Sequence, residues 1–142
     1  MIMKILSTIL LTLLIVLGAC TSPQVSPDPF VRVSNGRLTV NGKPYYYIGT
    51  NFWYGAILGS QGQGGNRERL LRELDYLKAL GINNLRVLVG ADGKDGIPTK
   101  AEPALQVEAG VYNDTIFDGL DFFLSELDKR DMYAVLFLNN SR

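Results

Sequence analysis

Residues 45–54 read Tyr-Tyr-Tyr-Ile-Gly-Thr-Asn-Phe-Trp-Tyr, an apolar and aromatic stretch that ends in polar and aromatic side chains. A second stretch, residues 84–89, reads Asn-Leu-Arg-Val-Leu-Val, and a segment with helical periodicity lies between the two. Short, nearly continuous apolar runs are typical of parallel strands that are covered on both faces. The two stretches therefore predict parallel strands with polar groups near their carboxyl ends.

Two helices and a third strand extend this pattern. Asn66 is a good N-cap for a helix of evenly spaced leucines that stops at Gly81. After a long loop from Gly90 to Asn113, a second amphipathic helix is expected over about 113–130, with Lys129 and Arg130 in its last turn, and a third strand over 132–138. Alternation of strands and helices implies a parallel sheet with right-handed crossovers.

The chain before the first long strand has the pattern of a small antiparallel sheet. Asn35-Gly36 and Asn41-Gly42 separate short alternating stretches, and Asn-Gly is a strong hairpin signal because both turn positions need positive φ. The third of these stretches, residues 43–48, is expected to lead directly into the first long strand.

The predicted fold class is α/β, as the amino-terminal part of a (β/α)8 TIM barrel, with a hairpin cap and about three βα strands. Such barrels present their sites at the carboxyl ends of parallel strands, as this chain does, but they need eight strands and ~250 residues. Residues 30–142 are therefore expected to form an incomplete barrel. Its third strand should expose an apolar face, because no following helix covers it.

The first residues have the pattern of a targeting segment. Residues 1–19 carry Lys4 and a short apolar run, which favours a signal peptide over a membrane span of ~20 residues. The run ends in Leu17-Gly18-Ala19-Cys20, which is similar to the lipobox of bacterial lipoproteins; an ordinary signal peptide with an incidental cysteine is the alternative. Lipid on Cys20, with residues 20–29 as a proline-rich tether, would anchor the protein to a membrane of the bacterial envelope. Secretion is the other location considered.

Composition excludes several kinds of chemistry. The chain has no histidine, which removes histidine-based triads and zinc sites of the HExxH type, and its single cysteine cannot form a disulfide within the chain. Fourteen basic and fourteen acidic residues balance, and no basic patch suggests nucleic acid. No cofactor and no metal site are predicted. Glu102 and Glu108 lie in the long loop, and we expect the acids of this loop to be solvated.

The candidate site residues follow the predicted strands. Arg86 lies within a strand predicted to be buried, where a guanidinium needs a carboxylate partner, whether for structure or for function. Asn51, Trp53 and Tyr54 follow the first strand, and amides beside aromatic rings suit sugars, whose C–H faces stack on rings. Phe52 and Trp53 should divide between the core and the surface. Asn139 and Asn140 end the third strand, where they bind sugar or only neighbouring loops.

The stretches 45–54 and 84–89 resemble sequences of glycoside hydrolase family 5, and within it those of the endo-β-1,4-mannanases. The resemblance implies β-mannan or a related β-1,4-linked polysaccharide as substrate, with Arg86 beside the nucleophile and sugar contacts from Asn51, Trp53, Tyr54, Asn139 and Asn140. It also implies a retaining mechanism with two glutamates, at the ends of strands four and seven. Neither is expected in this chain, which by itself should be inactive. The alternatives are a cellulase of the same family and a non-catalytic glycan-binding envelope lipoprotein.

Overall fold

The structure is a computed structural model that describes residues 28–96 and 101–138. The chain divides into two compact units, residues 1–45 and residues 46–142, and each is described by itself. The predicted signal segment and Cys20 lie outside the described residues, as do Asn139 and Asn140. No helix within the described ranges is long and apolar enough to cross a membrane.

The first unit contains a three-stranded antiparallel sheet in the order β1-β2-β3. Its strands are β1 (Arg32–Ser34), β2 (Arg37–Val40) and β3 (Lys43–Pro44). Both turns are the predicted Asn-Gly pairs, with φ of 50° at each asparagine and 74° at each glycine. The sequence predicts both hairpins correctly. The stretch predicted as the last strand of this small sheet, residues 43–48, is too long, because β3 ends at Pro44.

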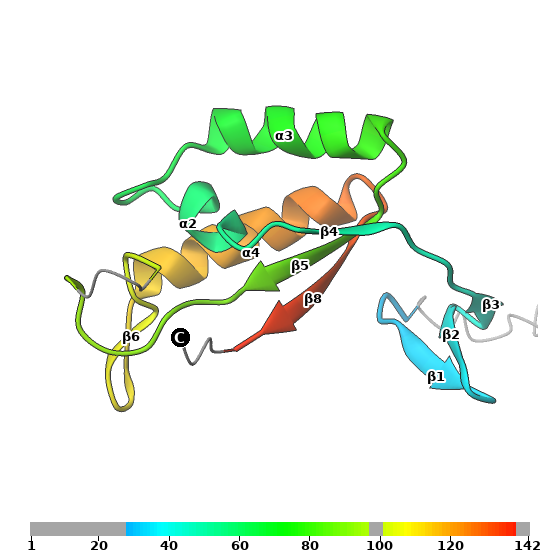
Figure 1. Ribbon diagram of the computed structural model, residues 1–142, viewed down its shortest axis with the longest axis horizontal. Coiled ribbons are helices and arrows are strands. Elements are labelled where there is room, and N and C mark those ends of the chain that lie inside the picture. The colour runs from blue at the N-terminus through cyan, green and yellow to red at the C-terminus, as the bar shows by residue number, and fades with distance from the viewer. Residues whose placement is uncertain (1–27, 97–100, 139–142) are drawn as a thin grey trace, which may run out of the picture. The chain divides into compact units, whose positions relative to one another are not determined.

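The second unit is built on a parallel sheet in the order β4-β5-β8 (Figure 1). Its strands are β4 (Gly49–Asn51), β5 (Asn84–Leu88) and β8 (Tyr133–Phe137). The chain enters β4 through side-chain hydrogen bonds: Asn83 accepts from the Ile48 N–H at 2.9 Å and donates to the Tyr46 carbonyl at 3.1 Å. The Asn83 side chain thus forms hydrogen bonds with backbone groups of Tyr46 and Ile48, which were predicted to belong to the first long strand.

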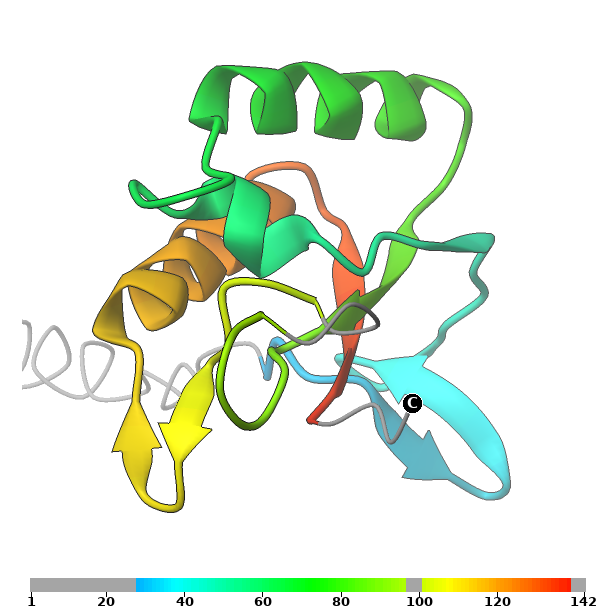
Figure 2. The ribbon, with the colours of Figure 1, turned by 60° about the vertical axis from the view of Figure 1, so that its left-hand side comes forward.

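Three helices lie on the same side of this sheet, as Figures 1 and 2 show. They are α2 (Gly55–Gly59), α3 (Arg67–Ala79) and α4 (Asp114–Asp128). The predicted N-cap at Asn66 forms, because its side chain accepts from the Arg69 N–H, and Asn113 caps α4 by accepting from the Thr115 N–H. The second predicted helix is too long by two residues, since α4 ends at Asp128 and Lys129 is its C-cap.

One helix and one β-hairpin were not predicted. Helix α2 occupies part of the turn after β4, where glycines at both ends of a five-residue helix hide the periodicity. The predicted loop from Gly90 to Asn113 contains a hairpin of β6 (Gln106–Glu108) and β7 (Val111–Tyr112). Leu105, just before this hairpin, is 7% exposed and belongs to the core, so tertiary packing orders this segment.

The two faces of the parallel sheet differ in burial. Leu85 and Val87 in β5 are fully buried with the helices, whereas Arg86 between them is exposed. In β8, Val135 is 53% exposed and Leu136 39%. Val135 lies beside Arg86 on the open face and Leu136 beside Val87 on the helix face, so the expected exposure of apolar residues in the third strand is found on both faces.

Helices α2 and α4 approach closely through two glycines. A Cβ on Gly119 would lie 2.2 Å from the Ala56 carbonyl oxygen, and one on Gly59 would lie 2.3 Å from the Gly119 carbonyl oxygen. Real Cβ atoms do not approach backbone so closely. The backbones of the two helices therefore meet where no side chain fits, and Phe123 packs beside this contact against Gly55.

We predict that Gly119→Ala destabilises the protein by about 1–3 kcal/mol, the usual cost of overpacking. Helix propensity alone predicts the opposite sign, a gain of about 0.8–1 kcal/mol. Chemical denaturation measures the difference, with Ser125→Ala on the exposed side of α4 as the control. An unchanged or raised stability for Gly119→Ala would contradict the close contact.

An ion network centred on the buried Glu126 joins α3 to the end of α4. Glu126 is 6% exposed, and its carboxylate accepts from Lys129 and, at 2.7 Å, from Arg130. Arg130 also donates to Asp75 of α3 at 2.7 Å. The hydrogen bond from Lys129, and then those from Arg130, hold the pKa of Glu126 below its ordinary value, although burial opposes them.

This lowered pKa predicts a pH dependence of stability. Because the carboxyl binds protons more weakly in the folded chain, Glu126 stabilises the fold above its unfolded pKa of about 4.5 and loses this contribution as the pH falls through the folded value. Glu126→Gln should therefore cost about 1–2 kcal/mol at pH 7. The cost should shrink below the unfolded pKa, as measured by urea titrations. Glu68→Gln, at an exposed pair, should change stability little at either pH.

Candidate functional site

Side chains from all three parallel strands meet on the exposed face of the sheet. Asn51 of β4 lies opposite Arg86 of β5, which lies opposite Val135 of β8. The Arg86 guanidinium donates to the Asn51 side-chain oxygen at 3.4 Å and stacks over the Phe137 ring, 3.8 Å from its centroid. The predicted pair of Asn51 and Arg86 is thus brought together, and Phe137 is added to it.

The environment predicted for Arg86 was wrong. The sequence indicated a buried guanidinium with a carboxylate partner, but the side chain is exposed and forms no ion pair with any described residue. The apolar run of β5 faces the helices through alternate residues only, so Arg86 occupies the open face. There a long hydrogen bond and an aromatic ring hold it, and a guanidinium has five donors in all.

The aromatic residues after β4 divide between core and surface, as predicted. Phe52 is 3% exposed and stacks on Phe123 of α4, with ring centroids 5.8 Å apart and planes 8° from parallel. Trp53 is 48% exposed. The chain turns here, with the Gly55 N–H donating to the Phe52 carbonyl, so Phe52 faces the core and Trp53 is the residue of this pair that is open to solvent.

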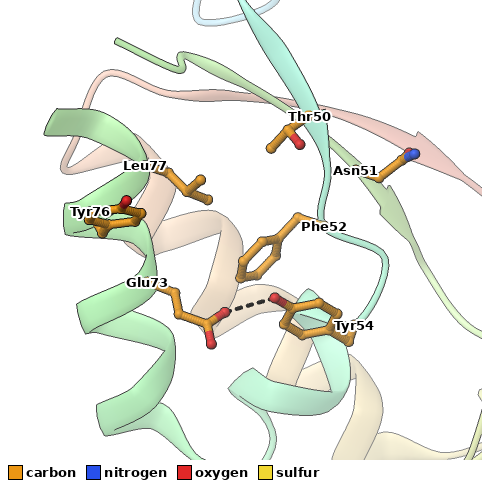
Figure 3. A pocket seen from close by; sticks show the side chains of 7 residues that line it. All are labelled: Thr50, Asn51, Phe52, Tyr54, Glu73, Tyr76 and Leu77. Atoms are coloured by element: carbon orange, nitrogen blue, oxygen red, sulfur yellow. Dashed lines mark hydrogen bonds between the residues drawn. The ribbon is translucent and has the colours of Figure 1, made fainter. Parts of the chain in front are cut away.

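Tyr54 turns toward the helices. Its hydroxyl donates to the Glu73 carboxylate of α3 at 2.8 Å, while the Asn51 side chain points away from both (Figure 3). Burial, and then the bond to Glu73, raise the pKa of the Tyr54 hydroxyl, so this group stays a donor through the neutral range. Sequence analysis grouped Tyr54 with Asn51 and Trp53, and its role in sugar binding stays a prediction.

A cavity of about 220 Å³ lies between β4 and α3 (Figure 3). It is lined by Thr50, Asn51, Phe52, Tyr54, Glu73, Tyr76 and Leu77. Sequence analysis missed Glu73 and Tyr76, because both read as the ordinary polar face of an amphipathic helix. Only the position of α3 beside β4 brings them to the turn that follows the strand.

Two acids of the long loop accept hydrogen bonds from its backbone. Glu102 was expected to be solvated; it is exposed, but its carboxylate accepts from the Gly96 N–H. Asp95 likewise accepts from the Ala104 N–H at 2.8 Å. Within the described ranges, no group of three or more acidic or cysteine side chains could hold a metal ion.

Comparison with known proteins assigns the family. A family model described as GH family 5 beta-mannosidase-like matches residues 28–142. The chain belongs to glycoside hydrolase family 5. This family 5 chain has an α/β fold that matches solved family 5 mannosidases, which are of the TIM barrel type, and its described part is consistent with an incomplete barrel.

Relatives and solved structures agree with this assignment. The chain is 34% identical over 110 residues to mannan endo-1,4-beta-mannosidase 1 of Oryza sativa subsp. japonica and 32% identical over 113 residues to mannan endo-1,4-beta-mannosidase 5 of Solanum lycopersicum. These alignments cover 77% and 78% of the chain, and 23% and 25% of the relatives.

The solved family 5 mannosidase of Rhizomucor miehei is similar at 36% identity with a TM-score of 0.71, over 76% of this chain and 27% of that one. A variant of that enzyme is known in complex with mannosyl-fructose. The chain therefore spans about a quarter of the length of the proteins it matches.

Proposed function

We propose that this chain is the amino-terminal part of an endo-β-1,4-mannanase that hydrolyses mannan with retention of configuration. The observation that carries the proposal is the open face of the sheet, where Asn51 at the end of β4 meets Arg86 in the middle of β5. The exposed Trp53 follows Asn51 by two residues. Family 5 membership and mannan endo-1,4-β-mannosidase relatives support mannan as the substrate.

Each residue has a role that its chemistry suits. The exposed Trp53 ring offers a flat apolar surface for a sugar, and the Asn51 amide can bind a hydroxyl. Arg86, stacked on Phe137, presents a fork of N–H donors that fits a carboxylate. A nucleophilic glutamate paired with it would stay ionised, because the positive charge lowers the carboxyl pKa.

The catalytic carboxylates are proposed to come from the remainder of the protein. No described glutamate lies at the carboxyl end of β4, β5 or β8, since Glu68, Glu73 and Glu126 are on helices and Glu102 and Glu108 on the β5–α4 connection. Retention requires two carboxyl groups ~5–5.5 Å apart, one as nucleophile and one as acid and base. The chain by itself is therefore proposed to be inactive.

The complete protein should hydrolyse mannan in preference to carboxymethyl cellulose. Arg86→Lys should lower kcat/KM on mannan at least tenfold, about 1.4 kcal/mol, because an ammonium cannot replace the two-pronged contact with a carboxylate. The matched control is Arg72→Lys, at an exposed ion pair on α3, which should keep full activity.

Three results would contradict this prediction. Preference for cellulose would assign the protein to the cellulases of the family. Binding of mannan oligosaccharides without hydrolysis of either polymer would favour the non-catalytic glycan-binding alternative. Equal activity of Arg86→Lys and Arg72→Lys would remove Arg86 from the catalytic site.

We also propose that lipid on Cys20 anchors the protein to the bacterial envelope. The lipobox-like end of the signal segment supports this, together with a cysteine that occurs once in the chain. In a bacterial host, radiolabelled palmitate should label the protein and leave Cys20→Ser unlabelled. Equal labelling of the two proteins, or labelling of neither, would contradict the anchor and favour secretion.

A further inference from the structure

The Tyr54 hydroxyl belongs to a charged network on the helix side of the β4–α2 turn. Glu73 accepts from Tyr54 with one carboxylate oxygen, at 2.8 Å, and from the Arg69 guanidinium with the other, at 2.6 Å. The same guanidinium lies 5.6 Å from the centroid of the Tyr54 ring. The hydroxyl and the ring of Tyr54 thus each contact one of two residues that lie one turn apart on α3.

The Tyr54 ring in turn supports Trp53. The two ring centroids are 5.4 Å apart with planes at 84°, an edge-to-face contact. On its other side, Tyr54 lies 4.5 Å from the ring of Phe52, which is buried in the core. Trp53 itself is about half exposed. The exposed indole is therefore connected to the core and to α3 through Tyr54.

We propose that Tyr54, Glu73 and Arg69 form a positioning network that holds Trp53 as a rigid aromatic platform for a sugar ring. Tyr54 then acts through Trp53 and does not itself contact the substrate. This inference rests on the proposed function for its substrate. The arrangement of the network itself is independent of that function.

The physical reason is preorganisation. A hydrogen bond to a carboxylate is stronger than one between neutral groups, and here it fixes the ring against which the indole rests. Without it, the indole must be ordered when the sugar binds, and that cost weakens binding. The chemical step depends on other groups, so the loss should raise KM and leave kcat nearly unchanged.

The first test uses fluorescence, because Trp53 is the only tryptophan of the 142-residue chain. Tyr54→Phe keeps the ring and removes the bond to Glu73, so it should raise acrylamide quenching of Trp53 and lower its anisotropy. Tyr76→Phe is the matched control: Tyr76 lines the same cavity, is 66% exposed and loses the same single oxygen. It should leave both signals unchanged.

A second variant approaches the network from the helix. Glu73→Ala should change Trp53 quenching as Tyr54→Phe does, whereas Glu68→Ala, at the exposed Glu68–Arg72 pair of the same helix, should not. Circular dichroism verifies that each variant keeps its helices. Identical quenching in the parent chain, Tyr54→Phe and Glu73→Ala would overturn the network.

The second test is kinetic and uses the complete enzyme. Tyr54→Phe should raise KM for mannan oligosaccharides about fivefold, equivalent to about 1 kcal/mol, with kcat within about twofold. In a Trp53→Ala background the same change should have no further effect, because the platform is already absent. A fall in kcat at unchanged KM, or effects of the two changes that simply add, would overturn the inference.

The two proposals can fail separately. A complete protein without activity on mannan would contradict the proposed function, and the fluorescence of Trp53 would still decide the network. Hydrolysis of mannan with the same KM in Tyr54→Phe and Tyr76→Phe would contradict the network and leave the proposed function standing.

Discussion

The structure of the second unit depends on the register of its parallel strands. Pairing of β4 with β5, and of β5 with β8, sends Leu85 and Val87 toward the helices and Arg86 to the opposite face. A slip of one residue would exchange the two sets, placing the guanidinium in the core and the leucine in water. Burial of one face therefore determines the chemistry of the other, where Asn51 and Arg86 meet.

The turn after β4 connects these two environments within three residues. Phe52 enters the core, Trp53 remains half exposed, and Tyr54 turns back to Glu73 on α3. The close contact of Gly59 and Gly119 holds α2, which begins just after this turn, against α4. Packing of the helix layer thus contributes to the position of a side chain that we assign to substrate binding.

Local patterns predicted the order of the parallel strands and of the two long helices, the Asn-Gly hairpins and the Asn66 cap, because each depends on residues close in sequence. The family resemblance pointed to the strand ends to which we assign the chemistry as a proposal. Periodicity could not reveal α2, which is too short, or the contact of Tyr54 with Glu73, which joins residues of different elements. Arg86 was misjudged because an apolar run does not tell which face of a strand a neighbouring layer covers.

The central claim is that the open face of the parallel sheet, and not the cavity on the helix side, is where substrate binds. A crystal structure of the complete protein with a mannan oligosaccharide tests it most directly. We predict a sugar ring stacked on Trp53 and a carboxylate that accepts hydrogen bonds from Arg86. An oligosaccharide bound in the cavity beside Glu73 and Tyr76, with no carboxylate near Arg86, would contradict the account.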